Sequence, residues 1–260
     1  MILPQGEDIF KERQREYNTN YVLRIRYNDA SMQTGVLFDM DGTLIDSHET
    51  HVECWLRYAA KEGVVLDRDR VNLTFGMVNR EIIRSFWPTE VSDEKMIEID
   101  LGKEAMVRDM FRANLPVMPG AVQLLQTLHE LGFKLAVASS GPQANVVLAC
   151  ELLGITPLLD AIVTGSDVKR GKPHPEIFLT AANRISVEPQ NCVVVEDATV
   201  GIQAAKAAGM KCIALLSTGH TESELKGADL IVRSLGEITG EITFALVRAS
   251  QSGVPTSTAQ

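Results

Sequence analysis

Two aspartates separated by one residue follow a short apolar run near the start of the chain. The run 35–38 leads directly into Asp39, and Asp41 and Gly42 come next. If the backbone stays extended, both carboxylates point the same way, and two negative charges in a small volume are stable only with a cation or a shared proton. Gly42 lets the backbone turn and approach a ligand closely. This pattern predicts a reactive or cation-binding site at the end of a buried strand.

Further polar residues stand at the ends of two later apolar segments and in a loop rich in Gly and Pro: Ser139 with Ser140, Glu196 with Asp197, and Lys172. In an open parallel sheet, ligands bind outside the carboxyl ends of the strands. We therefore expect these side chains to meet Asp39 at one edge of a sheet. Taken singly, each of them could instead cap a helix or pair with a surface charge.

The elements that would position these residues alternate regularly from residue 119 onward. Strand-like and helix-like segments follow each other with short connections, which predicts βαβ crossovers and an α/β fold with a doubly wound parallel sheet. After the first strand, the expected strands are 134–138, 161–164, 192–195, 211–215 and 230–232. The expected helices are 121–131, 143–153, 175–185, 200–208, a short one after Thr221, and 237–248.

A helical segment interrupts this pattern after the first strand. Apolar residues at spacings of three and four, with Ser47 near the start as a capping signal, indicate helices across 49–115. We interpret these residues as a small all-helical domain inserted into a core made of 32–48 and 116–250. Residues 1–31 are expected to be an N-terminal extension that buries little apolar surface, and 251–260 a flexible tail.

Composition limits the partners that the chain can have. The 260 residues include 45% hydrophobic and 23% charged residues, which is enough for a sizeable core. A net charge of −9 argues against general binding to nucleic acid or to anionic membranes. Four dispersed cysteines indicate neither a zinc site nor a disulfide framework. We expect a cytoplasmic protein that acts on a small molecule, and its oligomeric state stays open.

The stretch from Asp39 to Thr43 resembles the first motif of the haloacid dehalogenase superfamily of aspartate-nucleophile phosphatases. Ser139 resembles the second motif, Lys172 the third, and Glu196 with Asp197 the fourth, in the same order along the chain. The inserted helical domain is similar to the small helical cap of this superfamily. Four motifs in sequence make the resemblance specific.

The resemblance implies a role for each matching residue. A phosphate monoester is dianionic, so attack by a carboxylate needs a divalent metal and nearby cations. The implied cofactor is Mg²⁺, the implied nucleophile is Asp39 and the implied acid and base is Asp41. The implied metal residues are Asp39, Asp41 through its backbone carbonyl, Asp197 and Glu196. The implied phosphate-binding residues are Ser139, Lys172, Thr43 and Ser140.

Residues of the helical insertion are candidates for contacting the rest of the substrate. Arg80 and His48 are the first candidates, and His51, Lys103 and Arg108 are further ones. The competing interpretation is that these polar side chains form a solvated face of the insertion.

These observations favour a Mg²⁺-dependent phosphatase of small phosphorylated metabolites, with sugar phosphates as the expected substrates and an aspartyl-phosphate intermediate. One alternative is a phosphosugar mutase similar to β-phosphoglucomutase. However, Thr43 stands where those mutases typically carry Val, and Pro142 where they carry a phosphate-binding Lys. The other alternative is a non-catalytic binding or regulatory protein on the same scaffold. A haloalkanoate dehalogenase is less favoured, because it needs neither Asp41 nor the acidic pair at 196 and 197.

Overall fold

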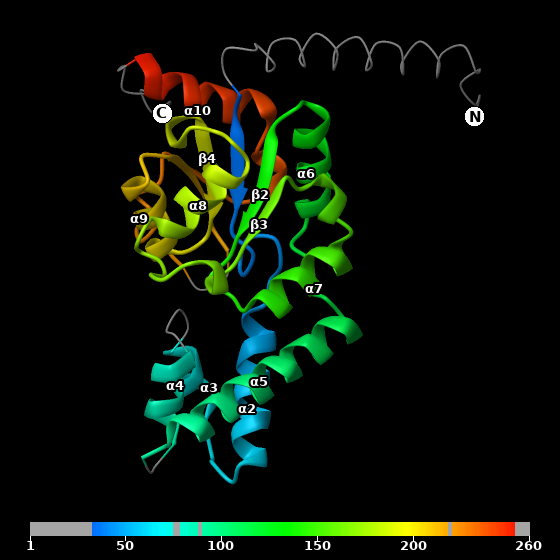
Figure 1. The fold of residues 1–260 in the computed structure, drawn as a ribbon, viewed down its shortest axis with the longest axis vertical. Helices are drawn as coiled ribbons and strands as arrows, with labels where there is room; N and C mark the ends of the chain where they lie inside the picture. The colour runs from blue at the N-terminus through cyan, green and yellow to red at the C-terminus, as the bar shows by residue number, and fades with distance from the viewer. Residues whose placement is uncertain (1–32, 75–78, 88–89, 218–219, 253–260) are drawn as a thin grey trace, which may run out of the picture.

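A six-stranded parallel sheet forms the centre of the computed structural model, which describes residues 33–74, 79–87, 90–217 and 220–252. The strand order is β3-β2-β1-β4-β5-β6 (Figure 1). The strands are β1 (Gly35–Phe38), β2 (Lys134–Ala138), β3 (Ala161–Val163), β4 (Cys192–Glu196), β5 (Lys211–Leu215) and β6 (Leu230–Val232). The doubly wound α/β sheet expected from the sequence is therefore present.

Helices cover both faces of this sheet, which explains why its central strands are apolar throughout. On one face lie α6 (Ala121–Glu130), α7 (Gln143–Leu153) and α10 (Gly240–Ser252), which pack with Val36 and Phe38 of β1. On the other face, α8 (Glu176–Arg184) and α9 (Thr199–Ala207) pack with Leu37. Each residue of β1 is completely buried as a result, including the one directly before Asp39.

Two aspartates fix the start of the outer strands. Asp160 precedes β3, where its Oδ2 accepts a hydrogen bond from the backbone N–H of Leu135 at 2.9 Å. Asp229 precedes β6 and accepts in the same way from the N–H of Cys212 at 2.8 Å, while also pairing with Lys206 and Lys211. Both aspartates stand at the edge of the sheet where the strands begin, opposite the edge predicted to bind ligand.

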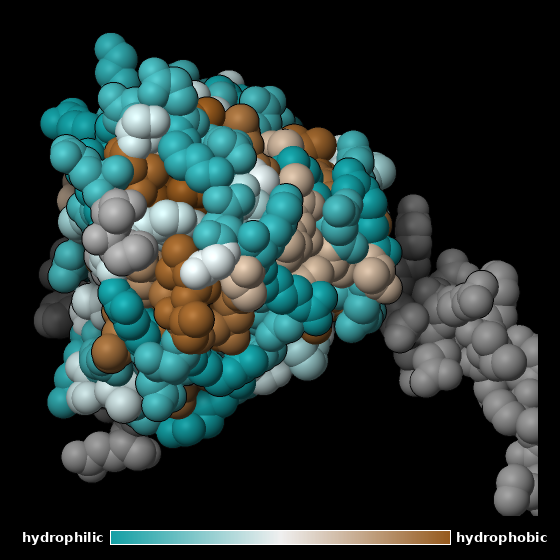
Figure 2. All heavy atoms as spheres, turned by 90° about the horizontal axis from the view of Figure 1, so that it is seen from below, coloured by the Kyte–Doolittle hydropathy of each residue, from teal (hydrophilic) through white to brown (hydrophobic). Residues whose placement is uncertain are grey.

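Helices α2 (His48–Lys61), α3 (Arg68–Asn72), α4 (Asn79–Phe86) and α5 (Asp93–Ala113) lie between β1 and β2 in the chain and form a separate unit, here called the cap (Figure 1). Its apolar core includes Trp55 and Phe86, whose rings meet edge to face with centroids 6.0 Å apart. The limits 49 and 115 that we assigned to this domain stay a prediction. Figure 2, viewed from the cap end, shows hydrophobic surface among hydrophilic residues. Exposed large apolar residues of the cap are Val65, Leu73, Ile97 and Leu101.

The two chain segments that join the cap to the core lie side by side. Asp46 donates its backbone N–H to the carbonyl of Pro116 at 2.7 Å, and Met118 donates to Leu44 at 3.0 Å. Between these bonds, residues 45 and 117 form an antiparallel bridge. The outgoing and returning segments therefore form a short paired ribbon.

Some local predictions differ from the structure. No helix follows Thr221: Glu224 and Ala228 each bond to the carbonyl three residues back, which gives turns instead of an α-helix. The last helix begins at Gly240 rather than at 237, after a single 3₁₀ turn, and it continues through 251 and 252, which were expected in the tail. The short helix α3 was not predicted. The N-terminal extension and residues 253–260 lie outside the described residues.

Candidate active site

The carboxyl ends of β1 and β4 bring the first and fourth polar clusters together. These strands pair in register, with Phe38 beside Val195, and the backbone N–H of Asp39 donates to the carbonyl of Val195 at 2.9 Å. Asp39 therefore lies next to the pair at 196 and 197. Strand β1 is also where the sheet changes its winding direction, since β2 continues the chain on one side and β4 on the other. This is the position at which open α/β sheets bind ligands.

Lys172 joins these two clusters. Its Nζ lies 2.5 Å from Asp39 Oδ1 and 2.7 Å from Glu196 Oε1, and all three side chains are at least nine-tenths buried. Burial alone would lower the pKa of Lys172, but the two carboxylates raise it above its usual value, so the ammonium is charged. The loop between β3 and α8 thus delivers a fixed positive charge to the end of β1.

Burial raises the pKa of Asp39 to about 7 against the opposing effect of Lys172, and the neighbouring Glu196 and Asp41 contribute to the increase. Burial also raises the pKa of Asp197 above its ordinary value, with further contributions from Glu196 and Asp39. The single ammonium of Lys172 offsets only part of this negative charge. The crowded carboxylates therefore fit a site for an additional cation.

The donor set fits Mg²⁺ better than a metal that needs many side-chain ligands. Within the described ranges, no group of three or more His, Cys, Asp or Glu side chains forms a metal cluster. Mg²⁺ commonly uses one or two carboxylates and keeps several waters. Asp39 and Asp197 could provide two carboxylates, whereas both oxygens of Glu196 accept bonds from the protein: Oε1 from Lys172, and Oε2 from the N–H groups of Asp197 and Ala198.

Asp41 occupies a different environment from Asp39. Ser47 Oγ donates to Asp41 Oδ1 at 2.5 Å, and His51 Nε2 lies 3.6 Å from the same oxygen. Although burial acts to raise the pKa of Asp41, its contacts with His51 and Ser47 and the charge of Lys103 lower it overall. We expected the side chain of Ser47 to bond to the free backbone N–H groups at the start of α2. It makes no such bond and donates to Asp41 instead. The two aspartates thus differ in proton affinity.

The predicted phosphate-binding residues have different surroundings. Ser139 is buried after β2, and its Oγ accepts from the N–H of Gly141 at 3.0 Å. A side chain at 141 would begin 3.6 Å from Asp41 Oδ2, so this loop lies beside Asp41. Ser140 is exposed, and Thr43 is fully buried with its Oγ1 3.5 Å from Asp197 Oδ1. Phosphate contacts by these residues stay a prediction.

The cap residues that we predicted to contact the substrate lie in different places. His48 is the first residue of α2, and partial burial lowers its pKa. His51 lies one turn later and faces Asp41. Arg80 pairs instead with Asp93 on the cap surface at 2.5 Å, and both side chains are more than half exposed. The described contacts do not link Arg80 to the aspartates of the core. Its role in substrate binding stays a prediction.

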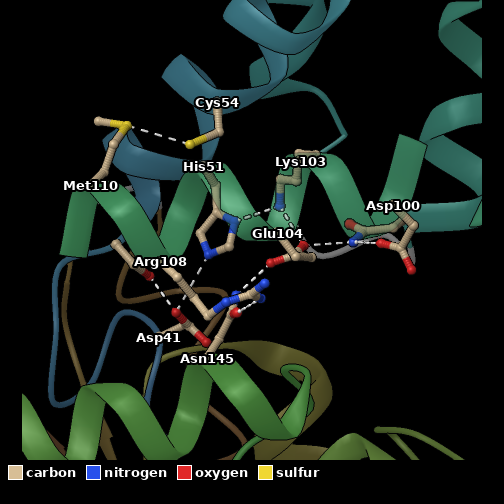
Figure 3. Close-up of polar contacts among 11 residues, drawn as sticks. Asp41, His51, Cys54, Asp100, Lys103, Glu104, Arg108, Met110 and Asn145 are labelled. Carbon is tan, nitrogen blue, oxygen red and sulfur yellow. Dashed lines mark hydrogen bonds and ion pairs between the residues drawn. The ribbon is translucent and has the colours of Figure 1, made fainter. Parts of the chain in front are cut away.

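A polar network connects the cap to the core beside Asp41 (Figure 3). Lys103 Nζ lies 2.8 Å from His51 Nδ1 and 2.7 Å from Glu104 Oε1, and Arg108 donates to the core residue Asn145 at 2.8 Å. Glu104 and Asn145 were not predicted from the sequence. One signal was present for the network: Lys103 falls on the buried stripe of α5, between residues 99 and 107.

The chain is similar to known proteins over most of its length. The model of the haloacid dehalogenase-like hydrolase family matches residues 34–209. The chain is 37% identical to validoxylamine A 7'-phosphate phosphatase of Streptomyces hygroscopicus subsp. limoneus, over 78% of this chain and 94% of that protein. It is 31% identical to hexitol phosphatase A of Escherichia coli (strain K12), over 79% and 93%. The structure of a β-phosphoglucomutase from Clostridium difficile is similar with a TM-score of 0.74 at 26% identity, covering 85% of this chain and all of that one.

Proposed function

The chain belongs to the haloacid dehalogenase-like hydrolase family, and we propose that it is a Mg²⁺-dependent phosphatase that hydrolyses small sugar phosphates through an aspartyl-phosphate intermediate on Asp39. The observation that carries this proposal is the position of Lys172. Its buried ammonium contacts Asp39 and Glu196 at the edge of the sheet where Asp41 and Asp197 also lie. A carboxylate with an adjacent fixed cation is the arrangement that attack on a phosphate dianion requires.

In the first step, Asp39 attacks phosphorus, a new Asp39 oxygen–phosphorus bond forms, and the bond to the leaving oxygen breaks. Asp41 protonates this oxygen, so the sugar leaves as a neutral alcohol. In the second step, Asp41 removes a proton from water, which attacks phosphorus and releases inorganic phosphate and free Asp39. Asp41 alternates between acid and base. Its contacts with Ser47 and His51 hold the carboxyl group in place, and the lower pKa that they cause favours its role as base.

The remaining residues bind and orient the phosphoryl group. Asp39 and Asp197 would hold Mg²⁺, with the backbone carbonyl of Asp41 as the family resemblance implies. When bound, Mg²⁺ neutralises charge on the phosphoryl oxygens. Lys172 supplies a permanent positive charge on the same side, and Ser139 a hydroxyl donor. Glu196 keeps Lys172 and the backbone at 197 and 198 in position.

Phosphosugar mutase activity is the second candidate, because the similar solved structures include β-phosphoglucomutases. A mutase must hold a bisphosphate and therefore needs a second cationic phosphate site. Pro142, at the start of α7, cannot supply one, and two cations of the cap already have protein partners: Lys103 contacts His51 and Glu104, and Arg108 contacts Asn145. These contacts favour a substrate with one phosphate.

The test is a phosphate-release screen of purified protein against phosphorylated metabolites, with and without Mg²⁺. We expect release from sugar or sugar-alcohol monophosphates that depends on Mg²⁺ and is lost in Asp39→Asn, which keeps the shape of the side chain. Turnover by Asp39→Asn at the wild-type rate would contradict the mechanism. Binding of these compounds without any release would favour the non-catalytic alternative.

The mutase is tested separately by phosphorus NMR with β-glucose 1-phosphate and a trace of the 1,6-bisphosphate. We expect inorganic phosphate to accumulate with little glucose 6-phosphate. Clean conversion to glucose 6-phosphate without free phosphate would assign the mutase activity instead.

A further inference from the structure

Glu104 is a cap residue whose carboxylate reaches the core. It is 4% exposed, and its Oε2 accepts from Asn145 Nδ2 on α7 at 2.5 Å. Its Oε1 accepts from Lys103 and from Asn79, both in the cap, at 2.7 Å. Asn145 is equally enclosed, with 6% of its surface exposed. A buried carboxylate is stable only when donors satisfy it, and here one donor belongs to the other domain.

The neighbouring residue, Lys103, extends the same group of contacts toward the reactive aspartate. Its Nζ lies 2.8 Å from His51 Nδ1, and His51 Nε2 lies 3.6 Å from Asp41 Oδ1. Two successive residues of α5 therefore connect to two different parts of the core: Glu104 to Asn145, and Lys103 through His51 to Asp41. Figure 3 shows these side chains converging in the space between α5 and α7.

This arrangement couples the docking of the cap to the position of His51. If the cap moves away from the core, the bond between Glu104 and Asn145 breaks. Because His51 belongs to the same cap, its contact with Asp41 is lost as well. Arg108, which donates to Asn145 Oδ1, keeps that amide oriented with its Nδ2 toward Glu104. The core residue thus has both of its polar atoms engaged by one face of α5.

We propose that Glu104 and Asn145 are positioning residues whose hydrogen bond docks the cap on the core in the arrangement that places His51 against Asp41. In this proposal the pair acts on Asp41 through the position of His51 and takes no part in bond making or breaking. The consequence for catalysis rests on the proposed function, in which Asp41 is the acid and base, whereas the docking itself does not.

The conformational test compares Glu104→Gln and Asn145→Ala with the wild type by small-angle X-ray scattering. Glu104→Gln keeps the shape but leaves one acceptor oxygen for three donors, Lys103, Asn79 and Asn145. If that oxygen stays with Lys103 and Asn79, the NH₂ group of Gln faces the NH₂ group of Asn145 and the bond between the domains is lost. The matched control is Glu98→Gln on the same helix, because Glu98 is exposed and its carboxylate pairs with Lys95, three residues earlier in the cap. We expect a larger radius of gyration in both test variants and no change in the control. An unchanged radius in both test variants would overturn the docking role.

The kinetic test separates positioning of Asp41 from general damage. Steady-state hydrolysis needs Asp41 as a base, so we expect kcat to fall about tenfold in each single variant. The double variant should lose no more, because both changes break the same hydrogen bond between Glu104 and Asn145. The first-turnover burst of p-nitrophenolate from p-nitrophenyl phosphate needs no proton from Asp41 and should stay within about threefold of the wild type. Additive losses in the double variant, or an equal loss of the burst, would overturn the proposal.

The two tests also separate this inference from the proposed function. A wild-type protein without phosphatase activity would contradict the proposed function and leave the scattering comparison valid. An active wild type whose two variants match it in kcat would contradict this inference alone.

Discussion

The carboxylate of Asp197 occupies the space in which a side chain at Gly42 would lie. A Cβ atom on Gly42 would stand 2.0 Å from Asp197 Oδ2, and the backbone of Gly42 has a φ of +82°, which favours glycine. The turn after β1 therefore approaches the end of β4 so closely that only glycine fits at position 42.

Gly42→Ala should displace Asp197 and disable the proposed metal site. We expect kcat/KM to fall about 100-fold or more, and the Mg²⁺ concentration for half-maximal activity to rise, because the displaced carboxylate is one of the two carboxylates proposed to bind the metal. Activity titrated against Mg²⁺ measures both effects.

Gly209→Ala is the matched control for this change. Its φ of +75° gives similar backbone strain, on the order of 1 kcal/mol, but nothing lies within 4 Å of the added Cβ. We expect a lower melting temperature with unchanged kinetics. If both variants lose activity equally, strain and not the displacement of Asp197 is responsible.

Removal of divalent metal should abolish turnover, because the phosphoryl charge would then face the carboxylates of Asp39 and Asp197, and the single ammonium of Lys172 offsets only part of that charge. The measurement is phosphate release after treatment with EDTA and after readdition of Mg²⁺. Full activity in metal-free buffer would contradict the metal-binding roles proposed for these residues.

Lys172→Gln should lower kcat/KM about 100-fold or more, since it removes the fixed positive charge beside the nucleophile. Lys169→Gln is the control, because Lys169 is exposed in the same loop. Steady-state kinetics on the best substrate from the screen distinguish the two. Equal kinetics for Lys172→Gln and the wild type would remove Lys172 from the mechanism.

Asp229→Asn should make the stability of the core less dependent on pH. Burial acts to raise the pKa of Asp229, but its bonds to Lys206, the N–H of Cys212 and Lys211 lower it overall. A lowered pKa means that the carboxylate stabilises the fold above its unfolded pKa and loses this effect as pH falls through the folded pKa.

The free energy of unfolding of Asp229→Asn should therefore be about 1–3 kcal/mol below that of the wild type at pH 7, with the difference shrinking below about pH 4. Urea unfolding across this pH range measures the effect. Asp109→Asn, which removes an exposed carboxylate paired with Arg112, should change little at any pH. If the difference in free energy of unfolding between Asp229→Asn and the wild type grows toward low pH, the pKa of Asp229 is not lowered by folding and this prediction is wrong.

The parts of the site at strand ends were predictable, because a buried strand imposes a continuous apolar pattern and a charged residue directly after it stands out. Asp39 and Asp197 were predicted in this way, whereas Lys172 was predicted from its loop rich in Gly and Pro and from the family resemblance. The fold class and family predicted from the sequence are confirmed. The contact between Glu104 and Asn145 was not predictable, since 41 residues separate them and neither lies at the end of a strand. Such a pair follows from how two domains meet and not from any local pattern.

A similar limit applies to Ser47 and to the segment after Thr221. A serine before a helix ordinarily satisfies the free backbone N–H groups of the first turn, but here the carboxylate of Asp41 competes for its hydroxyl. Thr221 and Glu224 make the side-chain contact of a helix start, yet no α-helix follows. Local signals identify a possible hydrogen bond, and tertiary contacts decide which partner forms it.

The paired ribbon at residues 44–46 and 116–118 has a consequence for how this protein could be re-engineered. The cap leaves and re-enters the core at neighbouring points. The core can therefore accommodate the cap as it would a long surface loop, without a change in the register of the strands of the sheet. Cap sequences of other lengths could be grafted between these two segments. A grafted cap would need counterparts of His51 and Glu104, because both lie between these segments and contact Asp41 and Asn145 of the core. Asp39 and Lys172 would stay on the core, so the ribbon separates the part of the chain that can be exchanged from the part that must be kept.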